Sequence, residues 1–346
     1  MKPCLFTLVG LLAASVAAHP AAAGNGVVIA ARGGGGKQND QAGGEAKQKD
    51  NQKNGKKNGS GAGAGAGANN GTANAATGGA NNATAGASGA LVLPDGRIKA
   101  DAVPEDFNVL ASVFKSAVVK GDGLVFSDLI SFPGGEASLF DKATNTKAFA
   151  INIDDKSIFV PQGGEPQSNT RRADLLPSIR SQLNDVAVTG VRTLHFSVQR
   201  DAAKPLNATH DYQLVNLESK DFSFHQFDVR TGADNGNDIA IFGNSKTAPA
   251  PEKIFSAPFG EGQFENFAMK LDFDANTVQV FHSTGQEALQ QVTEPIANDL
   301  TGLGEYHFAL QKNAVGDAPQ PQGIQEALIF GGIFMEDSTD GTVTLQ

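Results

Sequence analysis

The chain has 346 residues, among them 41 Gly and one Cys but no Trp, and its formal net charge is −10. Residues 91–346 hold 19 basic and 34 acidic residues, a net charge of −15, which disfavours a nucleic-acid-binding domain. An integral membrane protein is not expected either, because the one long apolar run lies at the extreme N-terminus and is too short to span a bilayer comfortably.

Residues 1–18 have the pattern of a signal peptide. Lys2 supplies the positive start, an apolar stretch runs from Leu5 to Val16, and small residues suit cleavage after residue 18 or as late as residue 23. Cleavage removes Cys4, so the mature chain would hold no disulfide. We therefore expect a secreted, extracellular protein, with cell-wall association as an alternative.

Residues 19–90 form a low-complexity segment. Residues 21–90 contain 19 of the 41 glycines and no Leu, Phe, Tyr or Trp, so this stretch cannot bury a core. We predict a disordered arm rich in Gly, Ala, Asn and Lys that serves as a solvated spacer, or as a basic tail that binds polyanions. Sequons for N-glycosylation, which suit a secreted glycoprotein, stand at Asn58, Asn70, Asn82 and Asn207.

Residues 91–346 are predicted to form one all-β domain. Short runs alternate apolar and polar residues or are rich in β-branched and aromatic residues, and turn residues separate them. No helix longer than about two turns is expected, apart from one near Glu105 to Phe114. Many strands in about 250 residues favour a two-sheet antiparallel sandwich, a β-jelly roll. The predicted strands are Phe149–Ile153, Thr193–Val198, Tyr212–Leu217, Phe224–Val229, Phe267–Phe273, Thr277–Phe281, Tyr306–Leu310 and Ala327–Phe330.

The segment from Leu271 to Phe281 allows two interpretations. Asp272, Asp274 and Asn276 have the spacing that begins a calcium-binding loop, but the sixth position is Thr277 instead of Gly and the twelfth is Ser instead of Glu. Asn and Asp also supply the turn of a β-hairpin. We predict a hairpin, and no metal or organic cofactor.

Most catalytic constellations are absent from the sequence. It holds no His-x-x-x-His pair, no Cys cluster and no Gly-x-Ser-x-Gly motif. Carboxylates remain, and an acidic secreted β-sandwich suits glycan hydrolysis, in which one carboxyl protonates the leaving oxygen and another acts as base or nucleophile.

Five motifs in order carry a family resemblance. They are Leu93-Pro-Asp-Gly-Arg97, Arg171-Arg-Ala-Asp-Leu-Leu-Pro177, Lys204-Pro-Leu-Asn-Ala-Thr-His-Asp-Tyr-Gln-Leu214, Leu271-Asp-Phe-Asp-Ala-Asn-Thr277 and Phe330-Gly-Gly-Ile-Phe-Met-Glu-Asp337. Over Leu91 to Asp337 the chain resembles the catalytic domain of glycoside hydrolase family 131. The resemblance implies a β-jelly roll with an open cleft, and a monomeric secreted fungal enzyme whose partner is cell-wall β-glucan with β-1,3, β-1,6 or β-1,4 linkages.

The resemblance also implies the catalytic carboxyls, Asp174 and Asp211, at positions where the family has glutamates. Each exchange shortens the side chain by one methylene, and the wider gap between the two carboxyls favours an inverting mechanism. Strand alternation places Asp211 and Gln213 on one face, so Glu218 points the opposite way unless a bulge changes the parity, and it is the fallback carboxyl. The substrate-binding candidates are Arg171, Arg172, His210, Gln213 and Gln226.

Other features temper the catalytic hypothesis. His282 and His307 are expected to be structural histidines. Sugar-binding clefts often stack sugar rings on Trp or Tyr. The chain has no Trp, and its only tyrosines are Tyr212 and Tyr306. Phe264 stands where a Trp is expected in family relatives. The alternative function is a catalytically weakened or inactive glycan-binding jelly roll. A structural matrix protein has less support, because the arm has no regular repeat.

Overall fold

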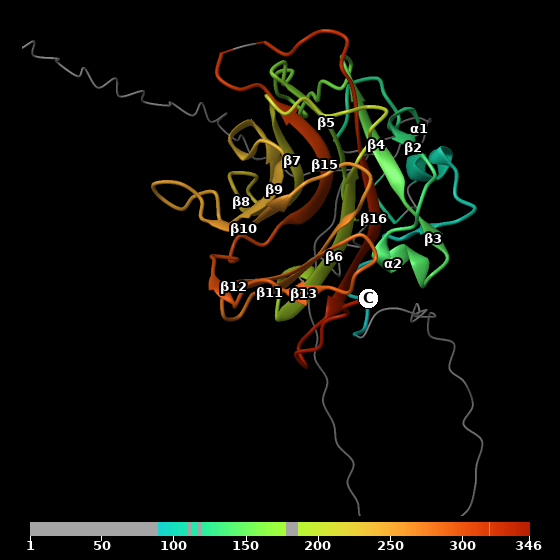
Figure 1. Ribbon diagram of the computed structural model, residues 1–346. Coiled ribbons are helices and arrows are strands. Elements are labelled where there is room, and N and C mark those ends of the chain that lie inside the picture. The colour runs from blue at the N-terminus through green and yellow to red at the C-terminus, as the bar shows by residue number, and fades with distance from the viewer. Residues whose placement is uncertain (1–88, 110–112, 116–118, 178–185, 318) are drawn as a thin grey trace, which may run out of the picture. The chain divides into compact units, whose positions relative to one another are not determined.

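Sixteen strands and five short helical turns form the part of the chain that the computed structural model describes, which is residues 89–346 without 110–112, 116–118, 178–185 and 318 (Figure 1). The predictions for residues 1–18 and for nearly all of 19–90 lie outside the described residues. The strands are β1 (Ile98–Lys99), β2 (Ile130–Ser131), β3 (Thr146–Lys147), β4 (Phe149–Asp154), β5 (Thr170–Leu175), β6 (Val191–Arg200), β7 (Asp211–Glu218), β8 (His225–Gly232), β9 (Asp238–Phe242), β10 (Lys253–Pro258), β11 (Glu265–Asp272), β12 (Thr277–Thr284), β13 (Gln290–Gln291), β14 (Ile296–Ala297), β15 (Glu305–Asn313) and β16 (Gln325–Asp337). The helices are α1 (Phe126–Leu129) and α2 (Leu139–Lys142), with 3-10 turns η1 (Pro104–Asn108), η2 (Val186–Val188) and η3 (Ala233–Asn235).

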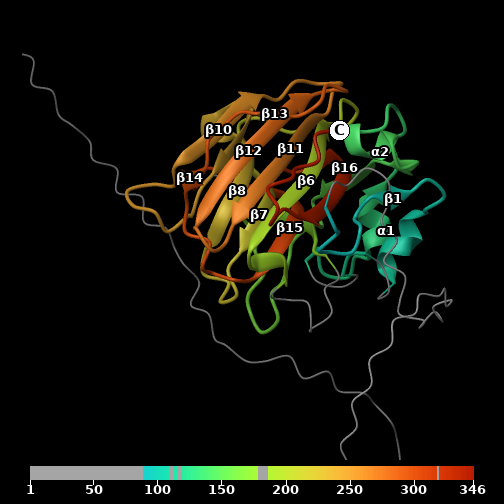
Figure 2. The same ribbon diagram turned by 90° about the horizontal axis from the view of Figure 1, so that it is seen from below.

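The long strands build two antiparallel sheets that pack face to face. One sheet has six strands in the order β10-β9-β8-β7-β15-β5. The other has eight, in the order β13-β12-β11-β6-β16-β4-β2 with β14 beside β12, and β1 and β3 form a small separate pair. Figure 2 shows β12, β11 and β6 in one layer and β8, β7 and β15 in the layer behind it. The predicted all-β sandwich is confirmed.

The core lies between the two sheets and follows from strand alternation. Every second side chain of a strand points inward, and these inward residues are apolar and almost fully buried. On β6 they are Leu194, Phe196 and Val198, and on β15 they are Tyr306, Phe308 and Leu310. Burial of this apolar surface is the main force that holds the sheets together.

The outer faces of the two sheets differ in their covering. On the eight-stranded sheet, α2 and the C-terminal segment cover the outer face, where Phe140, Phe334 and Leu289 form a second apolar cluster with Val343 packed against it. The polar outward residues of β6, such as His195, are therefore buried as well. On the six-stranded sheet, the outward residues of the central strands are polar and charged, and this face holds the candidate site.

The eight strands predicted from the sequence are all present, with ends that differ by a few residues. The hairpin is confirmed: Asp272 Oδ1 accepts hydrogen bonds from the backbone amides of Asp274 and Ala275, and Asn276 has φ of 54°. The helix expected near Glu105 is a 3-10 turn that ends at Asn108, and part of the predicted range lies outside the described residues. Sequence patterns missed β5, because its Arg and Asp side chains hide the short apolar alternation.

Candidate active site

The outer face of the six-stranded sheet gathers charged side chains from three neighbouring strands. Arg172 and Asp174 come from β5, His307 from β15 and Glu218 from β7. On β5, Ala173 and Leu175 point into the core, so Arg172 and Asp174 point outward. The order β7-β15-β5 places His307 between the two carboxyl-bearing strands.

His307 bridges the two carboxylates. Its Nδ1 lies 3.0 Å from Asp174 Oδ2, and its Nε2 lies 3.3 Å from Glu218 Oε2. The Glu218 side chain is 23% exposed, whereas those of Asp174 and His307 are buried. Arg172 forms a bidentate ion pair with Asp174, in which Nε lies 3.2 Å from Oδ1 and Nη2 contacts Oδ2. Of the two carboxyls that contact His307, Glu218 is therefore the one that a ligand can touch.

Each charged group of this cluster shifts the pKa of its neighbours in the direction that favours their charged forms. Burial raises the pKa of Asp174, but the Arg172 guanidinium and the His307 hydrogen bond outweigh it and lower that pKa to about 2. Burial lowers the pKa of His307, but the contacts with Asp174 and Glu218 raise it above its ordinary value. His307 in turn lowers the pKa of Glu218 against the effect of burial. The site thus favours two carboxylates with an imidazolium between them.

Register shifts bring Glu218 onto this face. Gln213 lies opposite Arg230 of β8 and Val215 lies opposite Val229, so Leu214 is one extra residue on β7. Leu214 and Leu217 both pack into the core, and Glu218 points outward with Gln213 although an unbroken alternation would separate them. The structure therefore contains the change of parity on which the choice of Glu218 depends.

The family model of the glycoside hydrolase 131 catalytic N-terminal domain matches residues 92–341. The chain belongs to glycoside hydrolase family 131. It is therefore a glycoside hydrolase, and the resemblance inferred from the five motifs is confirmed.

Two solved structures of family 131 share the fold of this chain. One is a β-glucanase catalytic domain from Podospora anserina, with 18% identity and a TM-score of 0.59 over 75% of this chain and 99% of that one. The other is a catalytic domain from Coprinopsis cinerea, with 20% identity and a TM-score of 0.55 over 74% of this chain and 97% of that one. The comparison with curated proteins gave no match.

Asp211, the second carboxyl predicted for this family 131 chain, does not lie beside Asp174. Asp174 pairs with Ala309 of β15, and Asp211 pairs with Asn313 on the other side of that strand. Glu218 is equally far from Asp174 along β15, because it pairs with Glu305, but its carboxyl reaches His307, which also contacts Asp174. Asp211 instead pairs with Arg230 at 2.8 Å and accepts a hydrogen bond from Asn313 at 3.1 Å. Asp211 and Asp174 thus have no common side-chain partner, and their joint action in catalysis stays a prediction.

The two predicted arginines have different surroundings. Arg172 lies on the polar face and holds Asp174, as described above. Arg171 is the next residue along β5, so its side chain points to the other side of the sheet. It donates hydrogen bonds to the backbone carbonyls of Ser168 and Thr170, at 2.8 and 3.0 Å. Of the two arginines, the structure brings only Arg172 to the Asp174–His307–Glu218 cluster.

The remaining predicted ligand residues are spread over the sheet. Gln213 is half-buried and lies on the polar face beside Arg230. Gln226 is fully buried, where its amide donates to Leu303 O and accepts from Gly302 N at 2.9 Å, so it anchors a loop and is not available to substrate. His210 lies just before β7, and burial together with nearby Lys312 lowers its pKa.

Sequence reasoning missed His307 as a member of the site. The pattern Glu305-Tyr-His-Phe contains the signal, because Tyr306 and Phe308 are core residues and the side chains between them must face outward. His282, expected to be structural, contacts Glu265 at 2.8 Å and packs against Phe267. Only the spatial neighbours distinguish the two histidines.

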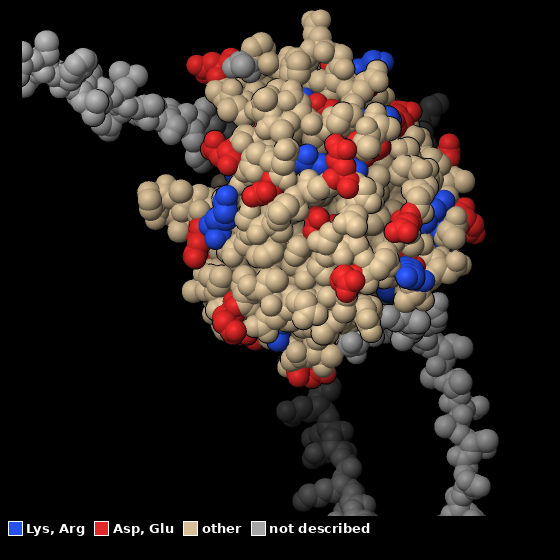
Figure 3. Space-filling view, viewed as in Figure 1, with Lys and Arg blue, Asp and Glu red and all other residues tan. Residues whose placement is uncertain are grey.

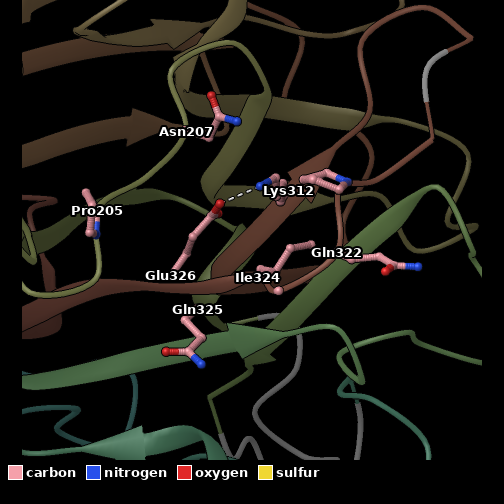
Figure 4. A pocket seen from close by; sticks show the side chains of 9 residues that line it. Pro205, Asn207, Lys312, Gln322, Ile324, Gln325 and Glu326 are labelled. Atoms are coloured by element: carbon pink, nitrogen blue, oxygen red, sulfur yellow. Dashed lines mark hydrogen bonds and ion pairs between the residues drawn. The ribbon is translucent and has the colours of Figure 1, made fainter.

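A cavity of about 420 Å³ lies at one end of the sandwich, away from this cluster (Figure 4). Within it, Lys312 forms an ion pair with Glu326, and both side chains are buried. The hydroxyl of Tyr212 donates to the other oxygen of Glu326 at 2.8 Å. Figure 4 shows Asn207 and Pro205 at one rim of the cavity and Gln322 and Ile324 at the other.

On the face drawn in Figure 3, Lys and Arg are scattered among Asp and Glu and form no continuous basic patch. Among the described residues no group of three or more His, Cys, Asp or Glu side chains is arranged to hold a metal ion. No helix in the described part is long and apolar enough to cross a membrane.

Proposed function

We propose that this chain hydrolyses glycosidic bonds of β-glucan, with β-1,3, β-1,6 or β-1,4 linkages, and that the reaction takes place over His307. The observation that carries the proposal is the contact series from Asp174 through His307 to Glu218 on an outward sheet face. Membership of family 131 and the β-glucanase fold of the Podospora anserina domain support the substrate class.

The spacing of the two carboxyls fits an inverting mechanism. One imidazole ring and two contacts separate the oxygens of Asp174 and Glu218, which therefore lie no more than about 8.5 Å apart. This upper limit overlaps the roughly 6.5 to 9.5 Å between the carboxyls of an inverting enzyme. Asp174 has a pKa of about 2 and is therefore ionised, the form in which a base acts, but a pKa this low makes it a weak base. His307 keeps a proton beside Glu218, and its Nε2 makes no hydrogen bond in the described structure, so this pair suits the role of acid.

The short side chain of Asp174 limits the proposed reaction. Its carboxyl is fully buried behind Arg172 and His307, where an attacking water has poor access. Misplacement of a catalytic group by about 1 Å can cost on the order of a hundredfold in rate. The enzyme is therefore expected to be slow, and Asp174→Glu is expected to raise kcat on β-glucan by about tenfold or more. Sugar release from laminarin, mixed-linkage glucan and cellulose measures this change, and a fall in rate would contradict it.

Substitutions on the same sheet face test the site. Glu218→Gln is expected to lower kcat by about a thousandfold, because it removes the carboxyl that is accessible to substrate. Asp211→Asn is the matched control and is expected to change kcat only a few-fold. If Asp211→Asn abolishes hydrolysis and Glu218→Gln does not, the assignment is wrong. Proton NMR of the first-formed anomer separates inversion from retention.

A glycan-binding protein without hydrolytic activity is the second candidate, and the burial of Asp174 is the observation that favours it. Binding of laminarin without release of sugar by either the wild type or Asp174→Glu would establish this alternative. Secretion through residues 1–18 and a monomeric state complete the proposal. N-terminal sequencing of the secreted protein and its mass in solution test these two points.

A further inference from the structure

A second cavity lies on the opposite side of the sandwich from the candidate active site. It has a volume of about 330 Å³. Gln199 of β6 lines it, and Gln199 points away from the core because its neighbour Val198 points inward. Phe264, next to β11, also lines it and packs with Ile329 and Ala327 in a small apolar cluster. The cavity thus belongs to the outer face of the eight-stranded sheet.

The walls of this cavity are rich in amides. Gln199, Gln263 and Gln286 line it, with Glu136 as the single charged side chain. Gln286 donates to the carbonyl of Ala137 at 2.9 Å, and its side-chain oxygen accepts no hydrogen bond from the described residues. The side chains of Gln199, Gln263 and Glu136 form no hydrogen bond with the described residues. Several donors and acceptors that have no hydrogen-bond partner among the described residues therefore line one space.

Glycines shape the entrance. Gly134, Gly135, Gly262 and Gly285 line the cavity and all have positive φ, between 68° and 98°, a conformation that glycine adopts without strain. A Cβ added at Gly134, Gly135 or Gly262 would meet no atom within 4 Å, so these turns border open space. Their bare backbone can approach a ligand closely.

We propose that this cavity is a second carbohydrate-binding site, which holds a glucan chain on the side of the molecule away from Glu218. Neutral amides both donate and accept hydrogen bonds and match sugar hydroxyls, while the apolar floor at Phe264 matches the C–H face of a sugar ring. No Lys or Arg lines the cavity, which excludes an anionic ligand as the natural match. Its volume lies at the lower end of the range for small-ligand pockets and suits one sugar unit. The choice of a glucose-based ligand rests on the proposed function.

The second site would keep the enzyme attached to its polysaccharide. A polysaccharide bound at two places on one enzyme dissociates more slowly than one bound at a single place, because the second contact forms at a high effective concentration. Insoluble glucan is the substrate form for which this attachment matters most.

The test uses the full chain with Glu218→Gln, so that bound sugar is not cleaved, and a soluble β-1,3-linked glucose hexasaccharide as the probe. Side-chain amide signals of Gln199 and Gln263 are followed by NMR during titration. We expect saturable shifts of both amides. A second variant adds Gln199→Ala and Gln263→Ala. In it, the apparent affinity for the hexasaccharide, measured from the shifts of the cavity glycines, should be at least tenfold lower, whereas the shifts at His307 should persist.

Gln290→Ala with Gln291→Ala, on the exposed strand β13, is the matched control and should leave the cavity shifts unchanged. Gln199→Trp is a single substitution that fills the cavity and keeps the Gln263 amide. It replaces the double variant in the test if the double variant does not fold. Unshifted Gln199 and Gln263 amides at saturation, or equal affinity in the double variant, would overturn the proposal. Hydrolysis by the wild type is measured separately, so binding at the cavity without hydrolysis would refute only the proposed activity.

Discussion

His307 organises the charges of the candidate site. Each of its ring nitrogens faces a carboxylate, and Arg172 holds the carboxylate that is more deeply buried. An isolated imidazole would lose its proton on burial, but here the two carboxylates raise its pKa above the ordinary value of about 6.5. The proton on His307 is therefore a property of the cluster, and its loss should be visible in the rate.

We expect the rate of hydrolysis to fall as the pH rises through the raised pKa of His307. Because the acid must hold its proton, the active form exists below that pKa and disappears above it. Asp174 stays ionised down to about pH 2, so it adds no loss of rate in the neutral range. A pH profile of kcat/KM on soluble glucan measures this alkaline fall in rate (the alkaline limb), with His307→Gln beside the wild type. An unchanged alkaline limb in His307→Gln would show that another group is responsible.

Strand β15 contributes side chains to both faces of its sheet. Its outward residues include His307, and its inward residues are core residues up to Leu310, after which Lys312 points inward and pairs with Glu326. Register shifts beside this strand decide which residues of β7 accompany His307. A buried ion pair costs desolvation energy, so its main effect is felt when one partner is lost.

Lys312→Met is expected to lower the free energy of unfolding by about 3 to 5 kcal/mol, because Glu326 would remain buried without a cation. Lys312→Met combined with Glu326→Gln should recover much of this loss. Denaturant unfolding followed by circular dichroism measures all three proteins. Equal stability of the single and double variants would mean that the ion pair is not the cause.

At the scale of the whole molecule, both sheets and their core come from residues 91 onward. The first described residues are tied to the last strand: Gly89 N donates to Glu336 at 3.0 Å, and Val92 N donates to Met335 O at 2.9 Å. Glu336 also accepts from the backbone of Thr344 at 2.7 Å. One buried carboxylate thus holds both ends of the described chain against β16.

A chain that begins at residue 86 is therefore expected to fold and to keep its melting temperature within about 2 °C of that of the full chain. It retains the contacts of Gly89 and the entire core. Differential scanning calorimetry of the two proteins checks this, with Glu336→Gln as a destabilised reference. A much lower melting temperature of the shortened chain would show that residues before 86 contribute to the fold.

The sequence by itself determined the class of fold and the family. Alternation along the strands predicted the all-β sandwich, and five ordered motifs indicated glycoside hydrolase family 131, because local residue patterns report which side chains must be buried and which turns form. Tertiary structure decided the site. A single extra residue in β7 reverses side-chain direction, which brings Glu218 to the face of Asp174. The order β7-β15-β5 then places His307 between Glu218 and Asp174, and no local pattern records how strands align.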